Sequence, residues 1–118
     1  MSNLAGPFIT KDSGERQEFP TGMRRDVQSD KPRYDLVYAG PLLERWAWLL
    51  KRGAEKYGDN NWTLASTQEE LDRFQSSAAR HFAQWMQGDQ TEDHAAAIVF
   101  NLNGALHVEA KMKEKGHG

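Results

Sequence analysis

Glu92, Asp93 and His94 stand side by side in the chain, directly after Thr91 and directly before a nearly apolar stretch. Polar groups beside a surface that must be buried need partners, and a ligand site is one way to provide them. The alternative is local, because carboxylates in the first turn of a helix are stabilised by the helix dipole alone. The dipole does not explain His94, which shares one helical face with Asn101, seven residues later.

A turn of unusual composition lies earlier in the chain. It reads Lys56-Tyr57-Gly58-Asp59-Asn60-Asn61-Trp62. Glycine, aspartate and asparagine are expected where φ turns positive. A loop with aromatic, amide and cationic side chains can stack a base and neutralise a phosphate. It can equally be the end of a helix with two aromatic anchors in the core, and the sequence leaves both interpretations open.

Four cationic residues lie within ten positions near the N-terminus: Arg24, Arg25, Lys31 and Arg33. Because arginine and lysine are the side chains that hold phosphate, one interpretation is an arm that grips a phosphate. The other is a solvated linker, since glycine and proline punctuate residues 1–30 and the apolar residues there are isolated.

The elements that must position these groups begin with an extended lead-in and a helix. The residue before a proline is pushed out of the helical region, so Lys31 to Val37 is expected to be extended. Pro41 suits the first turn of a helix. The apolar residues from Leu42 to about Lys56 recur at helical spacing and predict that helix.

The second helix is expected from about Thr67 to Gln87. Ser66 and Glu69 have the form of a capping box, in which Ser66 receives the helix and Glu69 reaches back, and Gly88 ends it. Its expected core face consists of Leu71, Phe74, Ala78, Phe82 and Trp85, and Arg80 and His81 lie off this stripe.

The third helix is expected to start at a cap provided by Thr91 and to run to about Lys113. Its apolar residues occur on all sides. Such a helix is central in a bundle or lies at a subunit contact.

The length, net charge and composition of the chain limit the class of protein. With 118 residues the chain is expected to form one domain with one modest core. A net charge of −2 gives no general electrostatic case for binding polymeric nucleic acid. The absence of cysteine excludes a disulfide framework and a thiolate metal site. Neither an apolar run of ~20 residues nor a signal-peptide pattern is found, so we expect a cytoplasmic protein without membrane contact.

These features predict an all-α fold, a small antiparallel bundle of three main helices. Residues 1–30 are expected to form an extended arm, residues 31–113 the helical domain and residues 114–118 a frayed tail. No segment is a candidate for a strand. Because a small helical core is often incomplete by itself, we expect a homodimer or a higher oligomer.

Four blocks of residues, in order, resemble a known family. They are Lys31-Pro-Arg-Tyr-Asp-Leu, then Gly53-Ala54-x-Lys56-Tyr57-Gly58-x2-Asn61-Trp62, then Arg80-His81, and finally Glu92-Asp93-His94-x6-Asn101. From about Thr21 to Glu109 the chain is similar to the phage-associated dATP/dGTP diphosphohydrolase N-terminal family, which looks related to the MazG-like all-α nucleotide pyrophosphohydrolases. If phage-encoded, the protein would act in the host cytoplasm.

The resemblance implies hydrolysis of a purine deoxynucleoside triphosphate to the monophosphate and pyrophosphate, with Mg²⁺ or Mn²⁺. MazG-like enzymes carry Glu-x-x-Glu and Glu-x-x-Asp pairs on two core helices. This chain departs from that pattern, because Glu44 is followed three residues later by Ala47 and because Glu92 and Asp93 are adjacent. The departure favours one alternative, a nucleotide-binding module without catalysis. A further alternative is a helical interaction protein in which the third helix is a dimer face.

On this resemblance the site residues divide by role. The metal is assigned to Glu44, Glu92 and Asp93, and the catalytic set is Glu92, Asp93, His94 and His81, with His81 or His94 positioning water or a phosphate oxygen. Lys56 and Arg80, with Lys31 or Arg33, are assigned to neutralising the phosphate charge. Tyr57, Asn61 and Trp62 are assigned to contacts with the base and sugar, and Asn101 to supporting the residues that touch the ligand. Glu55 is left out because it would lie about 16 Å from Glu44 along a straight helix.

Overall fold

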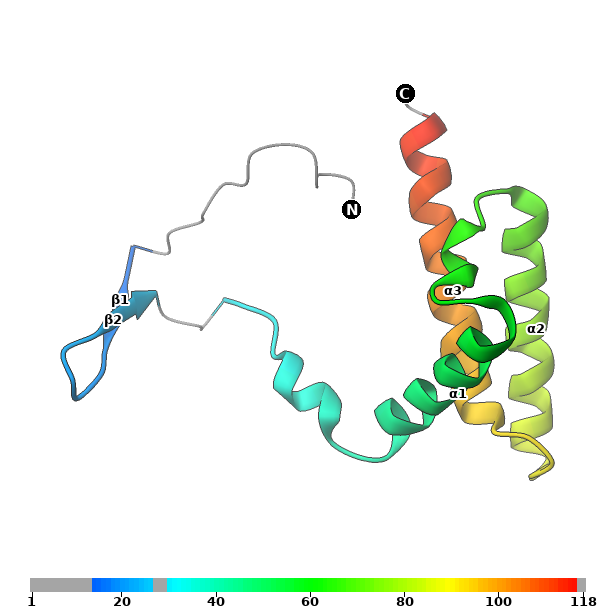
Figure 1. The fold of residues 1–118 in the computed structure, drawn as a ribbon, viewed down its shortest axis with the longest axis horizontal. Helices are drawn as coiled ribbons and strands as arrows, with labels where there is room; N and C mark the ends of the chain where they lie inside the picture. Colours follow the sequence, from blue (N-terminus) through cyan, green and yellow to red (C-terminus); the bar gives the residue numbers. More distant parts are fainter. Residues whose placement is uncertain (1–13, 27–29, 117–118) are drawn as a thin grey trace. The chain divides into compact units, whose positions relative to one another are not determined.

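The chain divides into two units, one up to Tyr34 and one from Asp35 onward. A computed structural model describes residues 14–26 and 30–116 (Figure 1). A short 3₁₀ helix, η2 (Tyr34–Tyr38), spans the boundary between the units, and all five of its residues are exposed. The expectation of an extended segment up to Val37 is therefore wrong.

The first unit contains a β-hairpin. Strands β1 (Arg16–Glu18) and β2 (Arg24–Asp26) pair in antiparallel fashion. The end pairs of the register are oppositely charged, with an ion pair of 2.9 Å between Arg16 and Asp26 and one of 3.5 Å between Arg24 and Glu18. Our expectation that no strand forms is wrong, because these strands depend on cross-strand charge and carry no apolar alternation.

The second unit holds three helices, α1 (Leu42–Tyr57), α2 (Gln68–Met86) and α3 (His94–Gly116). A short 3₁₀ helix, η3 (Asn61–Leu64), follows α1. Helix α3 packs extensively against the antiparallel α2, and it also contacts α1 and η3 (Figure 1). The predicted all-α bundle is confirmed. Of the two places expected for the third helix, the central one agrees with its contacts to α1, α2 and η3.

The start of α2 follows the expected chemistry one residue later than expected. The N–H of Glu70 donates to Thr67 Oγ1 at 3.2 Å, and the Glu70 carboxylate accepts from the N–H of Thr67 at 3.1 Å. The capping box is therefore Thr67 with Glu70, and its assignment to Ser66 and Glu69 is wrong. The N–H of Ser66 also donates to Glu70, at 2.8 Å.

The buried side of α2 differs from the expected stripe. Leu71 is buried and Phe74 packs against the core, but Phe82 and Trp85 are each 50% exposed. His81, which we expected off the stripe, is buried at 7% exposure. Helix α3 covers the side of α2 that carries Phe74 and His81, and it leaves the edge with Phe82 uncovered.

The contact between α2 and α3 depends on a glycine. A Cβ atom at Gly104 would lie 2.5 Å from the ring of Phe74. The buried apolar residues of the described chain are mostly alanine: Ala65, Ala96, Ala97 and Ala105, with Leu71 and Val108. The helices can therefore approach closely, but the core is limited in volume.

The start of α3 is capped by a different residue from the one expected. The N–H of Ala96 donates to Asp93 Oδ1 at 3.0 Å, so Asp93 satisfies a free backbone group of the first turn. Thr91 instead donates its hydroxyl to Asp89 at 2.8 Å. The helix continues to Gly116, past the expected end at Lys113. None of the helices in the described ranges is long and apolar enough to span a membrane.

Candidate functional site

A cavity of about 920 Å³ lies where α1, the turn after it and the start of α3 meet. It is lined by Ala47, Leu49, Leu50, Lys51, Arg52, Gly53, Ala54, Lys56, Tyr57, Gly58, Asp59, Asn60, Asn61, Trp62, Thr91, Glu92, Asp93, Ala97 and Phe100. Ligand pockets in proteins commonly measure about 300–1,000 Å³. The cavity is therefore large enough for a nucleotide.

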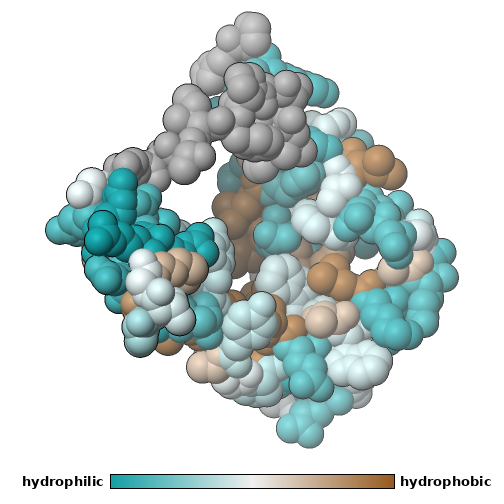
Figure 2. Space-filling model, turned by 60° about the vertical axis from the view of Figure 1, so that its left-hand side comes forward, coloured by the Kyte–Doolittle hydropathy of each residue, from teal (hydrophilic) through white to brown (hydrophobic). Residues whose placement is uncertain are grey.

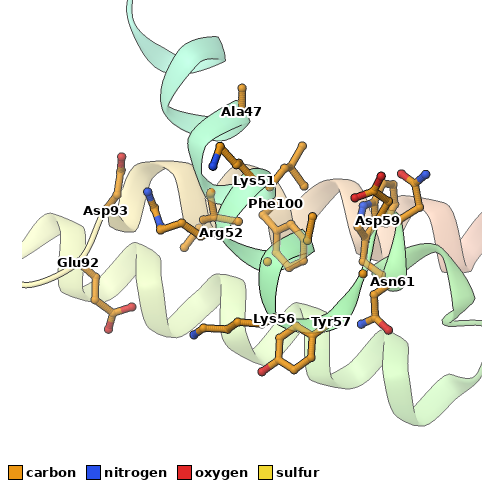
Figure 3. Close-up of a pocket in the computed structure, with 18 of the residues that line it drawn as sticks. Ala47, Lys51, Arg52, Lys56, Tyr57, Asp59, Asn61, Glu92, Asp93 and Phe100 are labelled. Carbon is orange, nitrogen blue, oxygen red and sulfur yellow. The ribbon is translucent and has the colours of Figure 1, made fainter.

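The apolar part of the lining comes from both helices. Leu50 and Ala54 lie one turn apart on α1, and Ala97 and Phe100 lie nearly one turn apart on α3. Helical spacing brings each pair to one side of its helix. In Figure 3, Phe100 stands between the two polar sides of the cavity.

The polar side chains fall into two sets on opposite sides of the cavity. Glu92 and Asp93 stand on one side, and Asp59 and Asn61 stand on the other (Figure 3). Arg52 and Lys56 of α1 extend toward the side of Glu92 and Asp93. One side thus combines cations with carboxylates, and the other combines an amide with a carboxylate.

Asp93 connects α3 to α1. Arg45 donates from Nε to Asp93 Oδ2 at 2.8 Å and from Nη2 to Oδ1 at 2.6 Å, in the two-bond geometry typical of arginine and carboxylate. The hydrogen bonds from Arg45 hold the pKa of Asp93 below its usual value, with a contribution from the N–H of Ala96. Both carboxylate oxygens of Asp93 are therefore already engaged.

The expected metal set does not assemble. Glu44 is exposed and does not line the cavity. Within residues 14–26 and 30–116 no three histidine, aspartate or glutamate residues are placed to hold a metal ion. The physical reason is helical rotation: Arg45 faces Asp93, so Glu44, one position earlier, points about 100° away around the helix. The prediction that Glu44 converges with Glu92 and Asp93 is wrong for this single chain.

The cations of α1 form a row that our sequence analysis recognised only in part. Arg45, Arg52 and Lys56 follow i, i+7 and i+11 spacing and therefore share one side of α1. Arg52 acts electrostatically on Asp93. Lys51 also lines the cavity, but it forms an ion pair of 2.7 Å with Glu55. The helical spacing from Arg45 to Lys56 is the signal in the sequence that could have identified Arg52.

The aromatic turn is anchored to α3. The carbonyl of Thr63 accepts from His107 Nε2 at 3.0 Å and also from the ammonium of Lys111. Trp62 packs edge-on against His107, with ring centroids 5.2 Å apart. Asn60 has a φ of 60°, as its type allows. Tyr57 is 70% exposed, so Trp62 is the anchor and Tyr57 is an accessible ring.

The structure places the predicted site residues in three ways. Lys56, Tyr57, Asn61, Trp62, Glu92 and Asp93 line the cavity, whereas Arg80, His81, His94 and Asn101 do not. Arg80 is exposed, and the amide of Asn101 donates to the carbonyl of Ala97 in its own helix at 2.8 Å. Lys31 and Arg33 belong to the first unit. Asp59, Asn60, Arg52 and Thr91 line the cavity and were not predicted.

His81 and His94 meet at the junction of α2 and α3. Their Nδ1 atoms are 2.8 Å apart, and His94 Nε2 is hydrogen-bonded to Asp89. Burial lowers the pKa of His81, the charge of Arg80 lowers it further, and Glu92 opposes both. The hydrogen bond from His94 lowers the pKa of Asp89. Asp89 was missed because its partner becomes a neighbour only when the turn between α2 and α3 closes.

The fold and cavity together define a class: a small all-helical domain with a nucleotide-sized cavity that is charged on one side and rich in amide and aromatic groups near the turn. Residues 21–117 match the family described as dATP/dGTP diphosphohydrolase, N-terminal, and the chain belongs to this family. The resemblance noted from the sequence is thereby confirmed. No curated protein matches the chain, and no solved structure matches it.

Proposed function

We propose that the domain binds a purine deoxynucleoside triphosphate in this cavity and hydrolyses it to the monophosphate and pyrophosphate. The observation that carries the proposal is the lining, in which Arg52 and Lys56 extend toward Glu92 while the aromatic and amide turn closes the other side. The family to which the chain belongs supports the same reaction class.

The triphosphate would lie against the cationic side. Arginine binds phosphate through several fixed donors and lysine acts as a compact point charge. Arg52 extends toward the side of Asp93 and acts electrostatically on it, whereas Lys56 makes no ion pair with another described residue. Charge that develops on the leaving pyrophosphate would be stabilised by these two groups.

The base and sugar would lie at the aromatic and amide turn. Tyr57 presents an accessible ring, and Trp62 is held in place by its contacts with Phe100 and His107. Stacking on an aromatic ring accepts any base, so discrimination must come from polar groups. The amide of Asn61 can both donate and accept hydrogen bonds, which suits a purine edge.

We propose that a Mg²⁺ or Mn²⁺ ion is shared between the protein and the triphosphate. Such ions keep several waters and are commonly bound by one or two carboxylates together with substrate phosphates. Glu92 has no ion-pair partner among the described residues and lines the cavity, so it would hold the ion. The ion would supply charge neutralisation at the phosphates.

The test is a screen of the eight common deoxynucleoside and nucleoside triphosphates with Mg²⁺ or Mn²⁺, with pyrophosphate as the detected product. We expect pyrophosphate and the monophosphate from dATP or dGTP, and loss of both when the metal is chelated. Release of single phosphates in place of pyrophosphate would contradict the proposed bond cleavage.

A second candidate, a nucleotide-binding module without catalysis, is favoured by one observation. The described residues contain no three-carboxylate group that could hold a metal by itself. This candidate predicts that a purine deoxynucleoside triphosphate raises the melting temperature without any product. A ligand at 100 times its dissociation constant stabilises a protein by ~2.7 kcal/mol, which a melting curve resolves. Pyrophosphate release in the same sample excludes it.

We also propose that the domain associates with a second copy of itself. Its buried apolar residues are few and mostly alanine, while Phe82, Trp85, Leu102 and Leu106 are half exposed. Figure 2 shows apolar patches among hydrophilic surface on the face in view. We expect a mass of at least twice 13.4 kDa in light scattering. A monomer at every concentration tested would contradict this proposal.

A further inference from the structure

Asp59 is a carboxylate on the side of the cavity that lies away from the cations. It lines the cavity together with Asn60 and Asn61, and it stands on the side opposite Glu92 (Figure 3). Asp59 makes no hydrogen bond or ion pair with another described residue. Its two oxygens are therefore available to a ligand in the cavity.

Asp59 belongs to a turn that is anchored to α3. Its two neighbours, Gly58 and Asn60, have positive φ values of 95° and 60°. Thr63 donates to the carbonyl of Asn60 from its N–H at 3.0 Å and from its hydroxyl at 2.6 Å. The carbonyl of Thr63 accepts in turn from His107 Nε2 at 3.0 Å. Hydrogen bonds thus hold the turn that carries Asp59 in place beside the cavity.

The charges of the cavity determine which end of a nucleotide can lie beside Asp59. A triphosphate carries several negative charges, so a carboxylate repels it. Arg52 and Lys56 extend toward the side of Glu92 and would attract it. The uncharged end of the nucleotide, its base and sugar, would therefore lie on the side of Asp59.

A carboxylate and an amide select a base in different ways. The amides of Asn60 and Asn61 can both donate and accept, and they can turn over to suit either purine. The ionised carboxylate of Asp59 can only accept. Guanine presents two adjacent N–H donors, at N1 and N2, whereas adenine presents a donor at N6 beside the lone pair of N1. Asp59 can therefore form two hydrogen bonds with guanine, but with adenine one oxygen would face a lone pair.

We propose that Asp59 selects guanine over adenine, so that dGTP is the preferred substrate of the domain. The inference rests on the proposed function, since it takes the cavity to be the nucleotide site. A good pair of hydrogen bonds discriminates between bases by roughly 5- to 150-fold. Because Asp59 is exposed and water competes for its oxygens, we expect about 10-fold in kcat/KM, near the lower end of this range.

The first experiment compares three substrates of the wild-type protein and needs no variant. dITP has the same ring as dGTP but lacks the amino group at N2, so it keeps one of the two donors. We expect kcat/KM for pyrophosphate release to decrease from dGTP to dITP to dATP, with about 10-fold between the first and the last. Equal values for dGTP and dATP, or a higher value for dATP, would overturn the proposal.

The second experiment uses Asp59→Asn, which keeps the size of the side chain and replaces one acceptor oxygen with an NH₂ donor. An asparagine can accept from adenine N6 and donate to adenine N1. We therefore expect kcat/KM to fall by about 10-fold for dGTP and to rise for dATP. The matched control is Asp72→Asn, an exposed carboxylate of α2 that accepts from Gln68 and does not line the cavity. It should keep the wild-type preference.

The same variant separates a contact with the base from a contact with the sugar. If Asp59 accepts from the 3′-hydroxyl instead, Asp59→Asn will lower kcat/KM by the same factor for dGTP, dITP and dATP. That result would refute the guanine contact and leave the proposed function standing. An Asp59→Asn variant with the wild-type preference for dGTP would do the same.

A binding measurement separates failure of this proposal from failure of the proposed function. If the wild-type protein releases no pyrophosphate, the proposed hydrolysis is refuted, and calorimetry with dGTP, dATP and Mg²⁺ decides the guanine contact alone. We expect dGTP to bind about 10-fold more tightly than dATP, and this difference to be lost in Asp59→Asn. Equal binding of the two nucleotides, or binding of neither, would refute the guanine contact as well.

Discussion

Helix α3 has two neighbours, and it contacts them in different ways. Against α2 it packs closely, since Gly104 approaches the ring of Phe74 and Leu71, Ala105 and Val108 form a buried cluster. Against α1 it makes a smaller contact, and α1, every residue of which the structure describes, has no fully buried side chain. Arg45 of α1 forms an ion pair with Asp93, the residue that caps the start of α3.

The difference separates stability from function. The α2–α3 pair supplies most of the buried core, whereas α1 supplies the cationic wall of the cavity. Changes on the α2 side should therefore lower the free energy of unfolding, and changes on the α1 side should alter ligand binding or turnover. Five predictions test this division.

The largest effect is expected at Glu92. We expect Glu92→Gln to lower kcat by about 100-fold, because a carboxylate that holds the metal–triphosphate complex is worth several kcal/mol in the transition state. The melting temperature should hardly change, since Glu92 is exposed. Pyrophosphate release and a melting curve measure both quantities. Glu109→Gln, an exposed carboxylate of α3 away from the cavity, is the control and should retain wild-type turnover.

The second-largest effect is on the free energy of unfolding, and it compares glycine-to-alanine substitutions in α3, where it faces α2, and in α1. Gly104→Ala places a methyl group 2.5 Å from the Phe74 ring and should cost about 1–3 kcal/mol of unfolding free energy. Gly53→Ala, in α1, meets nothing within 4 Å and should stabilise the helix by about 0.5–1 kcal/mol. Each kcal/mol shifts the melting temperature by roughly 4–8 °C in a domain of this size. Melting-temperature shifts of the same size and sign in the two variants would contradict the proposed difference between the α2–α3 contact and α1.

A smaller effect is expected at the cationic wall. Lys56→Met should raise KM for the triphosphate by about 10-fold, because a charge-assisted hydrogen bond of ~1.5 kcal/mol is lost. Lys51→Met is the matched control, since Lys51 also lines the cavity but is paired with Glu55 at 2.7 Å. If both variants raise KM equally, the cavity does not distinguish between the two lysines.

The smallest effect concerns the contact between α1 and α3. Asparagine caps a helix as well as aspartate does, so Asp93→Asn should remove the charge pair with Arg45 but keep the cap. Asp93→Ala should remove both and be less stable than Asp93→Asn by about 1 kcal/mol in denaturant unfolding. Equal stability of the two variants would show that the hydrogen bond from Ala96 to Asp93 contributes nothing.

The lowered pKa of Asp93 predicts how the stability of the fold changes with pH. Because Arg45 lowers the pKa of Asp93 in the folded state, the ion pair stabilises the fold above the ordinary aspartate pKa of about 3.9. This stability is lost as the pH falls through the lower pKa of the folded state. The advantage of the wild-type protein over Asp93→Asn should therefore be constant from pH 7 to about 5 and disappear toward pH 2. An advantage that grows on acidification would contradict the assignment.

Local chemistry explains what could be predicted from the sequence. The three helices and the turn at Gly58 follow from apolar periodicity and from residues that tolerate positive φ, which act within a few positions of one another. The capping box at Thr67 and Glu70 was misplaced by one residue, because Ser66 and Glu69 offer the same chemistry. The hairpin was missed because its cross-strand ion pairs leave no apolar pattern.

The part of the candidate site that could be predicted consists of two short continuous segments of the chain. Lys56, Tyr57, Asn61 and Trp62 line the cavity as a single turn, and Glu92 and Asp93 face them from the start of α3. The sequence by itself therefore determined the family, the helices and the residue types that are available for chemistry.

Only the tertiary structure decided which of these residues meet. A helical period shows which residues share a side but not which side a neighbouring helix will cover. The rotation of α1 brings Arg45 to Asp93 and turns Glu44 away, and the closure of the turn between α2 and α3 brings Asp89 to His94 and His94 to His81. The first outcome depends on packing between residues 48 positions apart, and the second depends on how the turn between α2 and α3 folds back. Spacing along a single helix predicts neither.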